Sequence, residues 1–407
     1  MGTDYRFKEV QKYNMTAEHN LFHKISLIFT LNYKGKLVSN TKLVVMKSRT
    51  TLFFLILAVS IVSCSSEIEK IDDNIPNVNS AYFPPIGTDD WENISLAELN
   101  WNADAVPTLL EYAASKNTKA LLILKNGRIA VEWYAPDFTK ESPWYWASAG
   151  KTLTAFTTGI AREEGFLQLT DKTSTYLGEN WTSLSKEKEE LISVWNQLTM
   201  TTGLDDTRGD CKTADCLIYI SDAGTRWSYH NAPYTLIQDV ISNATGTDFE
   251  NYYNLKLRDL IGMTGQWLSS NGSNNVYWSN ARSMARFGLL NQHNGVWEET
   301  TILGDTNFIN EMKNTSQDLN KSYGYLWWLN GKESAMIPNS QVIFQTPLIP
   351  NAPKDLYAGL GKNDQKLYIV PSLDLVIVRM GENTGITTLG PSSFDNELWD
   401  LINNVIN

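Results

Sequence analysis

The stretch that decides the fold reads Trp146-Ala147-Ser148-Ala149-Gly150-Lys151-Thr152-Leu153-Thr154-Ala155. Apolar residues then recur at near-helical spacing until Gly165, which predicts a helix beginning at this stretch. Residues three apart share a helix face, so Ser148 is expected beside Lys151. A lysine whose pKa is lowered by burial or by nearby positive charge can take the proton of a serine hydroxyl. Ser-x-x-Lys is also common by chance, and alone it more often marks an N-capping serine followed by an ordinary lysine.

Composition narrows the class of protein. The chain has 407 residues, 42% of them hydrophobic, and a net charge of −11, which suits one large domain or two lobes and lacks the basic surface of a nucleic-acid-binding protein. Of four histidines, only His230 and His293 follow residue 64, so a Ser-His-Asp hydrolase would have to use one of these. The histidines and the three cysteines show no metal-ligand spacing, and neither a metal nor a cofactor is predicted.

The N-terminal region has the pattern of an export signal. Met46-Lys47-Ser48-Arg49 precedes a short apolar run that ends in Ile61-Val62-Ser63-Cys64. The last four residues resemble a bacterial lipobox, which implies lipidation of Cys64. The alternative, a transmembrane anchor, is disfavoured because the run is well short of the ~20 residues needed.

This pattern divides the chain into four predicted parts. Residues 1–45 are expected to be an over-extended reading frame, 46–64 a lipoprotein signal peptide, 65–94 a polar tether and 95–407 the folded domain. The protein is therefore expected to be an exported lipoprotein held to the membrane by its lipid. The serine after Cys64 favours the outer membrane, with a periplasmic or surface-facing domain.

The order of the predicted elements indicates an α/β (α+β) fold. Asn126-Gly127 between two apolar runs predicts a β-hairpin over 120–134, preceded by a helix over 97–114. Strands are predicted at 341–345, 367–370 and 375–379, followed by a helix at 393–406. The middle of the chain is predicted to be mostly helical, at 186–195, 232–244, 249–261 and 280–292, with 263–277 as a connection. Strands near both chain ends suggest one antiparallel sheet flanked by helices, a separate helical lobe, and a site in the cleft between them.

A second candidate motif is Tyr229-His230-Asn231, which follows a turn-rich loop and precedes a helix. From a short turn, Tyr229 and Asn231 can both point into one cleft, and a tyrosine can relay a proton to a leaving group. By itself the segment would more simply be an aromatic loop. His230 lies between the two and is expected to be structural, because alternation turns it away from them.

Taken together, six segments resemble the serine β-lactamase and penicillin-binding-protein superfamily, in particular its class C-like branch of esterases and 6-aminohexanoate-dimer hydrolases. The matching segments are 148–151, 160–171, 197–204, 229–231, 281–288 and 323–328. The resemblance covers roughly 95–405 and implies a β-lactamase/transpeptidase-like fold. It also implies Ser148 as nucleophile, Lys151 and Tyr229 as general base and acid, and Asn231 as a residue that positions Lys151 and the substrate.

The third motif of that superfamily departs from its usual form. Where relatives carry Lys-Thr-Gly or His/Ser/Ala-x-Gly, this chain has Gly359-Leu360-Gly361. Neither a lysine nor a hydroxyl stands at the first two positions, which argues against efficient β-lactam or D-Ala-D-Ala chemistry. Gly361 still allows close backbone approach, and the N–H of Lys362 could join that of Ser148 in binding an oxyanion.

The sequence supports three functional hypotheses and does not identify the substrate. The leading one is a serine hydrolase acting on a small ester or amide; the alternatives are a D-Ala-D-Ala carboxypeptidase and a non-catalytic envelope binding protein.

Export favours a disulfide between Cys211 and Cys216 over two free thiols, and this disulfide would shape the mouth of the cleft. The tryptophans at 144, 146, 227, 327 and 328 either line the pocket or belong to the core. The sequence does not indicate an oligomeric state.

Overall fold

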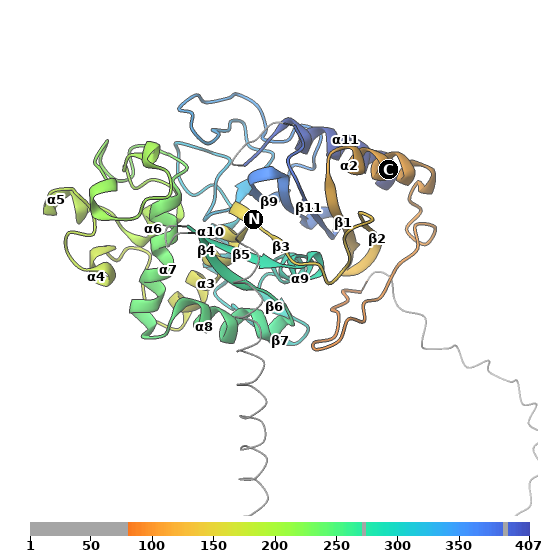
Figure 1. The fold of residues 1–407 in the computed structure, drawn as a ribbon, viewed down its shortest axis with the longest axis horizontal. Coiled ribbons are helices and arrows are strands. Elements are labelled where there is room, and N and C mark those ends of the chain that lie inside the picture. The colour runs from red at the N-terminus through yellow and green to blue at the C-terminus, as the bar shows by residue number, and fades with distance from the viewer. Residues whose placement is uncertain (1–79, 271–273, 386–389) are drawn as a thin grey trace, which may run out of the picture. The chain divides into compact units, whose positions relative to one another are not determined.

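A six-stranded antiparallel sheet is the centre of the fold, with the strand order β2-β1-β11-β10-β9-β8 (Figure 1). The strands are β1 (Thr118–Lys125), β2 (Arg128–Tyr134), β8 (Trp328–Leu329), β9 (Tyr357–Gly361), β10 (Gln365–Val370) and β11 (Leu375–Gly381). Asn126 and Gly127, with φ of 50° and 83°, form the tight turn between β1 and β2. Because β1 pairs with β11, the two ends of the domain meet in one sheet, and the predicted fold class is confirmed.

The computed structural model describes residues 80–270, 274–385 and 390–407. The predicted extension, signal peptide and lipidation at Cys64 lie outside the described residues, as does most of the predicted tether. Within the described part of the chain, no helix is both long and apolar enough to span a bilayer.

Helices cover both faces of the sheet. On one face lies α9 (Ala281–Gln292), where a Cβ on Gly288 would lie 2.4 Å from the Val376 side chain and 2.9 Å from that of Leu367, so glycine lets this helix pack closely on the sheet. The next residue, Tyr368, points to the opposite face and packs on Trp399 of α11 (Ser393–Ile406), with ring centroids 5.7 Å apart. Beside α11 lies α2 (Val106–Ser115).

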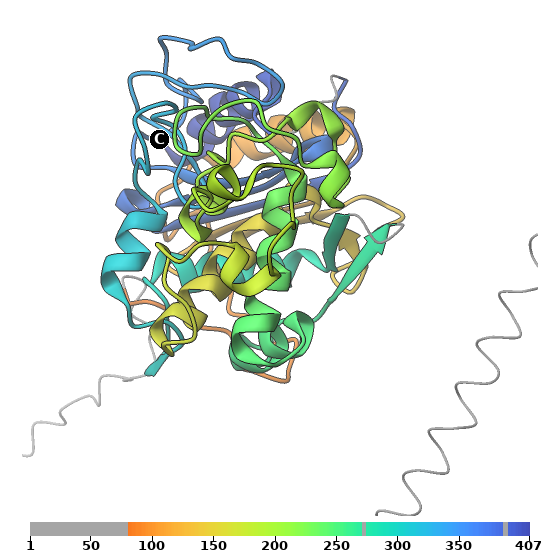
Figure 2. The same cartoon turned by 90° about the vertical axis from the view of Figure 1, so that its left-hand side faces the viewer.

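The remaining elements form the predicted helical part, seen from a second side in Figure 2. Its long helices are α3 (Lys151–Glu163) and α7 (Asn231–Thr245), and its shorter ones are α4 (Ser174–Leu177), α5 (Lys186–Glu189), α6 (Val194–Leu198), α8 (Phe249–Tyr253) and α10 (Thr306–Met312). A smaller sheet combines β3 (Trp144–Tyr145), β4 (Gln266–Ser270) and β5 (Asn274–Ser279), and β6 (Val296–Trp297) pairs with β7 (Thr300–Thr301). Residues 151–161 of α3 are all buried, so this helix runs through the core.

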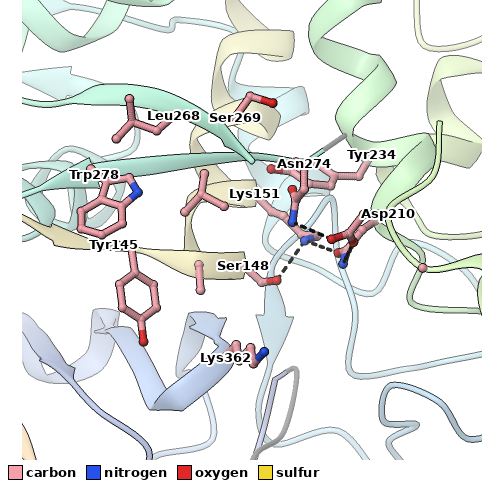
Figure 3. A pocket seen from close by; sticks show the side chains of 14 residues that line it. Tyr145, Ser148, Lys151, Asp210, Tyr234, Leu268, Ser269, Asn274, Trp278 and Lys362 are labelled. Carbon is pink, nitrogen blue, oxygen red and sulfur yellow. Dashed lines mark hydrogen bonds between the residues drawn. The ribbon is translucent and has the colours of Figure 1, made fainter. Parts of the chain in front are cut away.

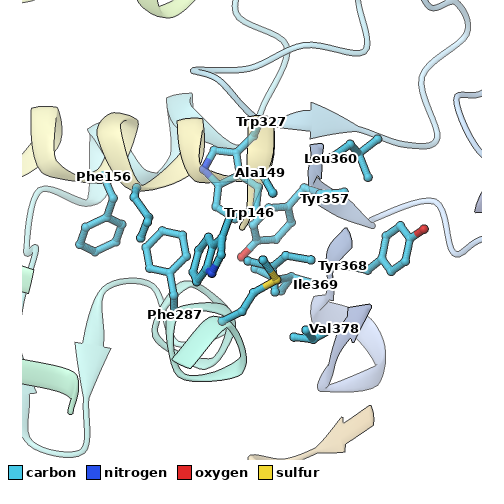
Figure 4. Close-up of a cluster of buried hydrophobic side chains, with 14 of the residues drawn as sticks. Trp146, Ala149, Phe156, Phe287, Trp327, Tyr357, Leu360, Tyr368, Ile369 and Val378 are labelled. Carbon is cyan, nitrogen blue, oxygen red and sulfur yellow. The ribbon is translucent and has the colours of Figure 1, made fainter. Parts of the chain in front are cut away.

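Aromatic side chains fill the space between α3, α9 and the large sheet (Figure 4). Phe287 lies between Trp146 and Trp327, with centroid distances of 6.2 and 6.1 Å, and Trp327 contacts Tyr357 at 5.1 Å. Trp227 and Trp328 are equally buried. None of the five tryptophans at 144, 146, 227, 327 and 328 lines the active-site pocket; four belong to the buried core, and the fifth, Trp144, is partly buried and packs against that core.

Several predicted elements differ from the structure. The predicted strand over 341–345 is wrong: this exposed segment makes a single bridge, between Phe344 and Ala335, because β8 already occupies that edge of the sheet. The connection predicted at 263–277 instead holds β4 and most of β5, a pair of antiparallel strands that Asn271-Gly272 in the sequence could have indicated.

The helices predicted at 97–114, 186–195 and 249–261 are shorter or divided. The first begins only at Val106, where Pro107 suits the first turn. The second is two short helices, the later one begun by the capping residue Ser193. The third passes from α8 into a π-helical turn and then a 3₁₀ turn.

Candidate active site

Ser148 lies in a 3₁₀ turn, Ala147–Gly150, directly ahead of α3. Trp146 anchors this turn to β5: its backbone N–H donates to Tyr277 O at 2.8 Å and its indole Nε1 donates to Ser279 Oγ at 2.8 Å. Ala147 has a φ of +47°, a strained conformation for a residue with a side chain. The strain sits next to the serine that the sequence indicates as a nucleophile. In a 3₁₀ turn residues i and i+3 eclipse, which aligns Ser148 with Lys151 even more directly than the predicted α-helix would.

Strand β9 packs against this turn through Gly361. A Cβ at position 361 would lie 2.5 Å from Trp146 O and 3.1 Å from the backbone nitrogen of Ser148. Gly359 is less restricted, since its Cβ would meet Ala149 O at 3.3 Å. Glycine at 361 therefore allows the backbone of β9 to approach the nucleophile turn, as the sequence predicted.

The segment after Gly361 is held in an unusual conformation. Asn363 and Asp364 both have left-handed φ values, 60° and 58°. The buried guanidinium of Arg379 donates to both of their carbonyl oxygens, at 2.8 and 3.0 Å. Asn363 also donates to the hydroxyl of Tyr145 at 2.8 Å. These contacts fix the position of Lys362, which lines the pocket beside Ser148 (Figure 3).

Lys151 is buried, with 2% of its surface exposed, and its Nζ donates to Ser148 Oγ at 2.9 Å. The same Nζ donates to Asn231 Oδ1 at 2.7 Å. Burial lowers the pKa of Lys151 to about 7, although the nearby charge of Asp210 raises it. A large fraction of this amine is therefore neutral near pH 7 and able to accept a proton.

Two tyrosine rings enclose the amine of Lys151. Its Nζ lies 4.0 Å from the ring centroid of Tyr234 and 5.1 Å from that of Tyr229. Burial raises the pKa of Tyr229 far above its usual value, while the Ser148 side chain beside it acts in the opposite direction. Tyr229 is thus a neutral phenol at neutral pH, which suits a proton donor better than a base.

Asn231, the first residue of α7, joins Lys151 to a carboxylate that the sequence did not single out. Its Nδ2 donates to Asp210 Oδ1 at 2.7 Å. Ser148, Lys151, Asn231 and Asp210 thus form one continuous hydrogen-bonded chain, drawn with dashed lines in Figure 3.

These residues open onto a cavity of about 610 Å³. Polar groups lie on one side of Ser148 and an apolar wall on the other, as Figure 3 shows. The lining comprises Tyr145, Ala147, Ser148, Lys151, Gly209, Asp210, Asn231, Tyr234, Leu268, Ser269, Asn274, Val276, Trp278 and Lys362. A cavity of this size, with its mixed lining, suits a small organic substrate.

The other predicted site residues are not among those that line the pocket: Tyr229, Gly359, Gly361, Cys211 and Cys216. The disulfide between Cys211 and Cys216 is present, in the loop that holds Asp210. His230 does not line the pocket, and burial lowers its pKa to about 4, so it is neutral at pH 7. Within the described residues, no group of three or more His, Cys, Asp or Glu side chains could hold a metal ion.

The structure adds residues that sequence reasoning missed. Tyr234 stands three positions after Asn231 on α7, so helical spacing could have indicated it. Asp210 and the wall formed by β4 and β5 carry no such signal, because they come from loops and strands distant in the chain.

Comparison with known proteins places the chain in a family context. A family model described as β-lactamase matches residues 113–385, well over half of the chain. No curated protein sequence matches. Among solved structures, a candidate 6-aminohexanoate-dimer hydrolase from Bacillus anthracis is similar, with a TM-score of 0.56 and 20% identity over 80% of this chain and 86% of that one.

Two further structures share the fold. A family VIII carboxylesterase has a TM-score of 0.55 and 12% identity, covering 75% of this chain and 96% of its own. A penicillin-binding protein from Bacillus halodurans has a TM-score of 0.51 and 15% identity, covering 73% and 99%. At these identities the similarities show the fold alone.

Proposed function

Because this chain belongs to the β-lactamase family of serine hydrolases, we propose that it hydrolyses a small ester or amide through an acyl-enzyme formed on Ser148. The observation that supports this most directly is the geometry of the buried Lys151 amine, 2.9 Å from Ser148 Oγ, with a pKa of about 7. A general base works best when its pKa lies near the working pH.

In the proposed acylation step, neutral Lys151 takes the proton of Ser148 while Oγ forms a bond to the substrate carbonyl carbon. The backbone N–H groups of Ser148 and Lys362 bind the resulting oxyanion, a role that the close packing of Gly361 supports. When the carbon–leaving-group bond breaks, the proton on Lys151 passes through the neutral phenol of Tyr229 to the departing oxygen or nitrogen. Asn231 holds the Lys151 amine in place.

Deacylation reverses this route with water in place of the alcohol or amine. Lys151 takes a proton from water, the hydroxide attacks the acyl carbon, and Ser148 leaves with its proton restored. The product is a carboxylic acid. The absence of a lysine or hydroxyl at 359–360 favours esters and simple amides over substrates whose carboxylate those side chains would hold.

The test is covalent labelling of the full chain, purified in mild detergent, with a fluorophosphonate probe. Ser148 Oγ should bond to phosphorus as fluoride leaves and the hydroxyl proton is lost, which adds the mass of the probe less HF to the intact protein. The adduct should disappear in Ser148→Ala and in Lys151→Ala, and the labelling rate should fall as the pH drops below about 7, where Lys151 becomes protonated. A folded wild-type protein that never labels would instead favour a non-catalytic envelope binding protein.

The cellular location is a separate part of the proposal. The lipobox-like segment 61–64 supports an exported protein anchored by a lipid on Cys64, in the outer membrane. Feeding cells an alkyne fatty acid should label the full chain but not its Cys64→Ala variant. Label that survives in Cys64→Ala, or a wild-type protein that fractionates with soluble material, would refute the anchor.

A further inference from the structure

The carboxylate of Asp210 lines the active-site pocket, yet the proposed reaction assigns it no step. It is half-buried and accepts a hydrogen bond from Asn231 Nδ2 at 2.7 Å. A longer contact, at 3.5 Å, joins its other oxygen to Asn274 Nδ2. Asp210 thus stands at the end of the hydrogen-bonded chain that begins at Ser148.

The position of Asp210 determines which way the carboxamide of Asn231 is oriented. A carboxamide has an accepting oxygen at one corner and a donating nitrogen at the other, and the two corners are nearly equal in size. An ionised carboxylate only accepts, so it draws the nitrogen of Asn231 toward itself. The oxygen must then face Lys151, whose Nζ donates to it at 2.7 Å. In the opposite orientation, the carboxamide oxygen would face the Asp210 carboxylate and the N–H group would face the lysine amine.

The loop around Asp210 is built to hold its position. Gly209 just before it has φ 66° and ψ −124°, a conformation open mainly to glycine. Cys211 just after it is tied to Cys216. The following residue, Lys212, pairs with Asp239 of α7 at 3.3 Å, so the loop is tied to the helix that begins with Asn231.

We propose that Asp210 is a positioning residue of the acylation reaction, which orients the carboxamide of Asn231 so that its oxygen holds the Lys151 amine against Ser148. This inference rests on the proposed function of Ser148 and Lys151. Asp210 acts through Asn231 and exchanges no proton with the substrate.

A second effect of Asp210 is electrostatic and makes the proposal measurable. The groups that face Lys151 are the neutral phenols of Tyr229 and Tyr234, the Asn231 amide and the Asp210 carboxylate, with the exposed Lys362 on another wall of the pocket. Among these, the charge of Asp210 raises the pKa of Lys151. Removing the charge should therefore make Lys151 neutral at a lower pH.

Two variants separate the two effects. Asp210→Leu removes both the acceptor and the charge, whereas Asp210→Asn removes the charge and keeps an oxygen that Asn231 can donate to. Asp215→Asn is the matched control, because Asp215 is an exposed carboxylate on the same disulfide loop and hydrogen-bonds to Thr213 instead of Asn231. All three are made in the full chain, and their folding is checked by circular dichroism.

The measurement is the second-order rate of fluorophosphonate labelling between pH 5.5 and 9. On the high-pH plateau, where Lys151 is neutral in every variant, Asp210→Leu should label about ten- to a hundredfold more slowly, the range expected for losing a hydrogen bond to a charged group. Asp210→Asn should keep most of the plateau rate, while the midpoint of its pH profile falls by about 1 pH unit. Asp215→Asn should match the wild type in both rate and midpoint.

The outcomes distinguish this inference from the proposed function. If the wild type labels and Asp210→Leu labels equally fast with an unchanged midpoint, Asp210 has no positioning role, although the serine hydrolase stands. Equal labelling combined with weaker turnover of cationic substrates alone would also overturn the proposal, since Asp210 would then bind substrate. Loss of labelling in Asp215→Asn would overturn the specific role of Asp210, because any change in this loop would then disrupt the site. A wild type that does not label rejects the proposed function itself.

Discussion

Replacing Lys151 by methionine should abolish labelling of Ser148 and yet stabilise the folded protein near neutral pH. Lys151 is 2% exposed, and burial lowers the pKa of its amine from 10.5 to about 7. A tenfold change in a proton-binding constant corresponds to about 1.4 kcal/mol, so a pKa that falls from 10.5 to about 7 on folding costs about 5 kcal/mol of folding free energy. Methionine has a similar length and can be buried without that cost.

The free-energy cost of burying Lys151 falls as the pH rises. Between pH 7 and about 10.5 the unfolded chain still holds the lysine proton while the folded protein has lost it. The free energy of unfolding of the wild type therefore rises with pH across this window, by at most about 1.4 kcal/mol per pH unit from this group. Below pH 7 both states are protonated, and the full cost of about 5 kcal/mol remains.

The assay is urea unfolding followed by tryptophan fluorescence at several values between pH 6 and 10. The quantity of interest is the difference in unfolding free energy between Lys151→Met and the wild type, because most other titrating groups cancel in it. This difference should shrink by about 4 kcal/mol from pH 7 to 10. The methionine also removes the hydrogen bonds to Ser148 and Asn231, but that loss adds mainly a constant offset.

Lys212→Met provides the control, since the Lys212 side chain is 31% exposed and pairs with Asp239 at the surface. Its difference from the wild type should stay nearly flat over the same range. The difference in unfolding free energy between Lys151→Met and the wild type could also stay constant with pH, to within about 1 kcal/mol. In that case the pKa of the buried amine is not lowered to about 7, and Lys151 cannot serve as the base near neutral pH.

Three further changes test other parts of the site. Gly361→Ala should slow labelling strongly and destabilise the fold by about 1–3 kcal/mol, because its Cβ would lie 2.5 Å from Trp146 O. Urea unfolding and labelling rates measure these effects, and no change in either would contradict the close packing of β9 on the nucleophile turn. Tyr229→Phe should slow hydrolysis of an alkyl amide by about 10²–10⁴-fold but affect a p-nitrophenyl ester far less, since that leaving group needs no proton. Equal losses on both substrates in steady-state kinetics would remove Tyr229 from the role of proton donor. Replacing Cys211 and Cys216 together by serine should lower the unfolding free energy by about 2 kcal/mol and slow labelling, because Asp210 adjoins the disulfide; an unchanged labelling rate would mean that the loop holds Asp210 without it.

Local features of the chain were sufficient to predict much of the fold. The hairpin at Asn126-Gly127 and the helix after Gly150 depend on turn chemistry and periodicity, which neighbouring residues set. Predictions from local sequence pattern were wrong where pairing with distant strands decides the structure of a segment. The segment 341–345 has a strand-like composition, but β8 occupies the edge of the sheet. The segment 263–277 is predicted to be a connection, but most of it forms the paired strands β4 and β5.

In the active site too, some features follow from local sequence and others only from tertiary packing. The pairing of Ser148 with Lys151 could be predicted because three residues of helical backbone bring them together whatever surrounds them. The lowered pKa of that lysine could not, because it arises from burial under Tyr229 and Tyr234, which reach it only when distant segments pack. The same is true of Asp210, whose contact with Asn231 spans 21 positions of the chain. The sequence thus contains the reactive groups, whereas desolvation and long-range hydrogen bonds, which exist only in the folded protein, make the amine a base.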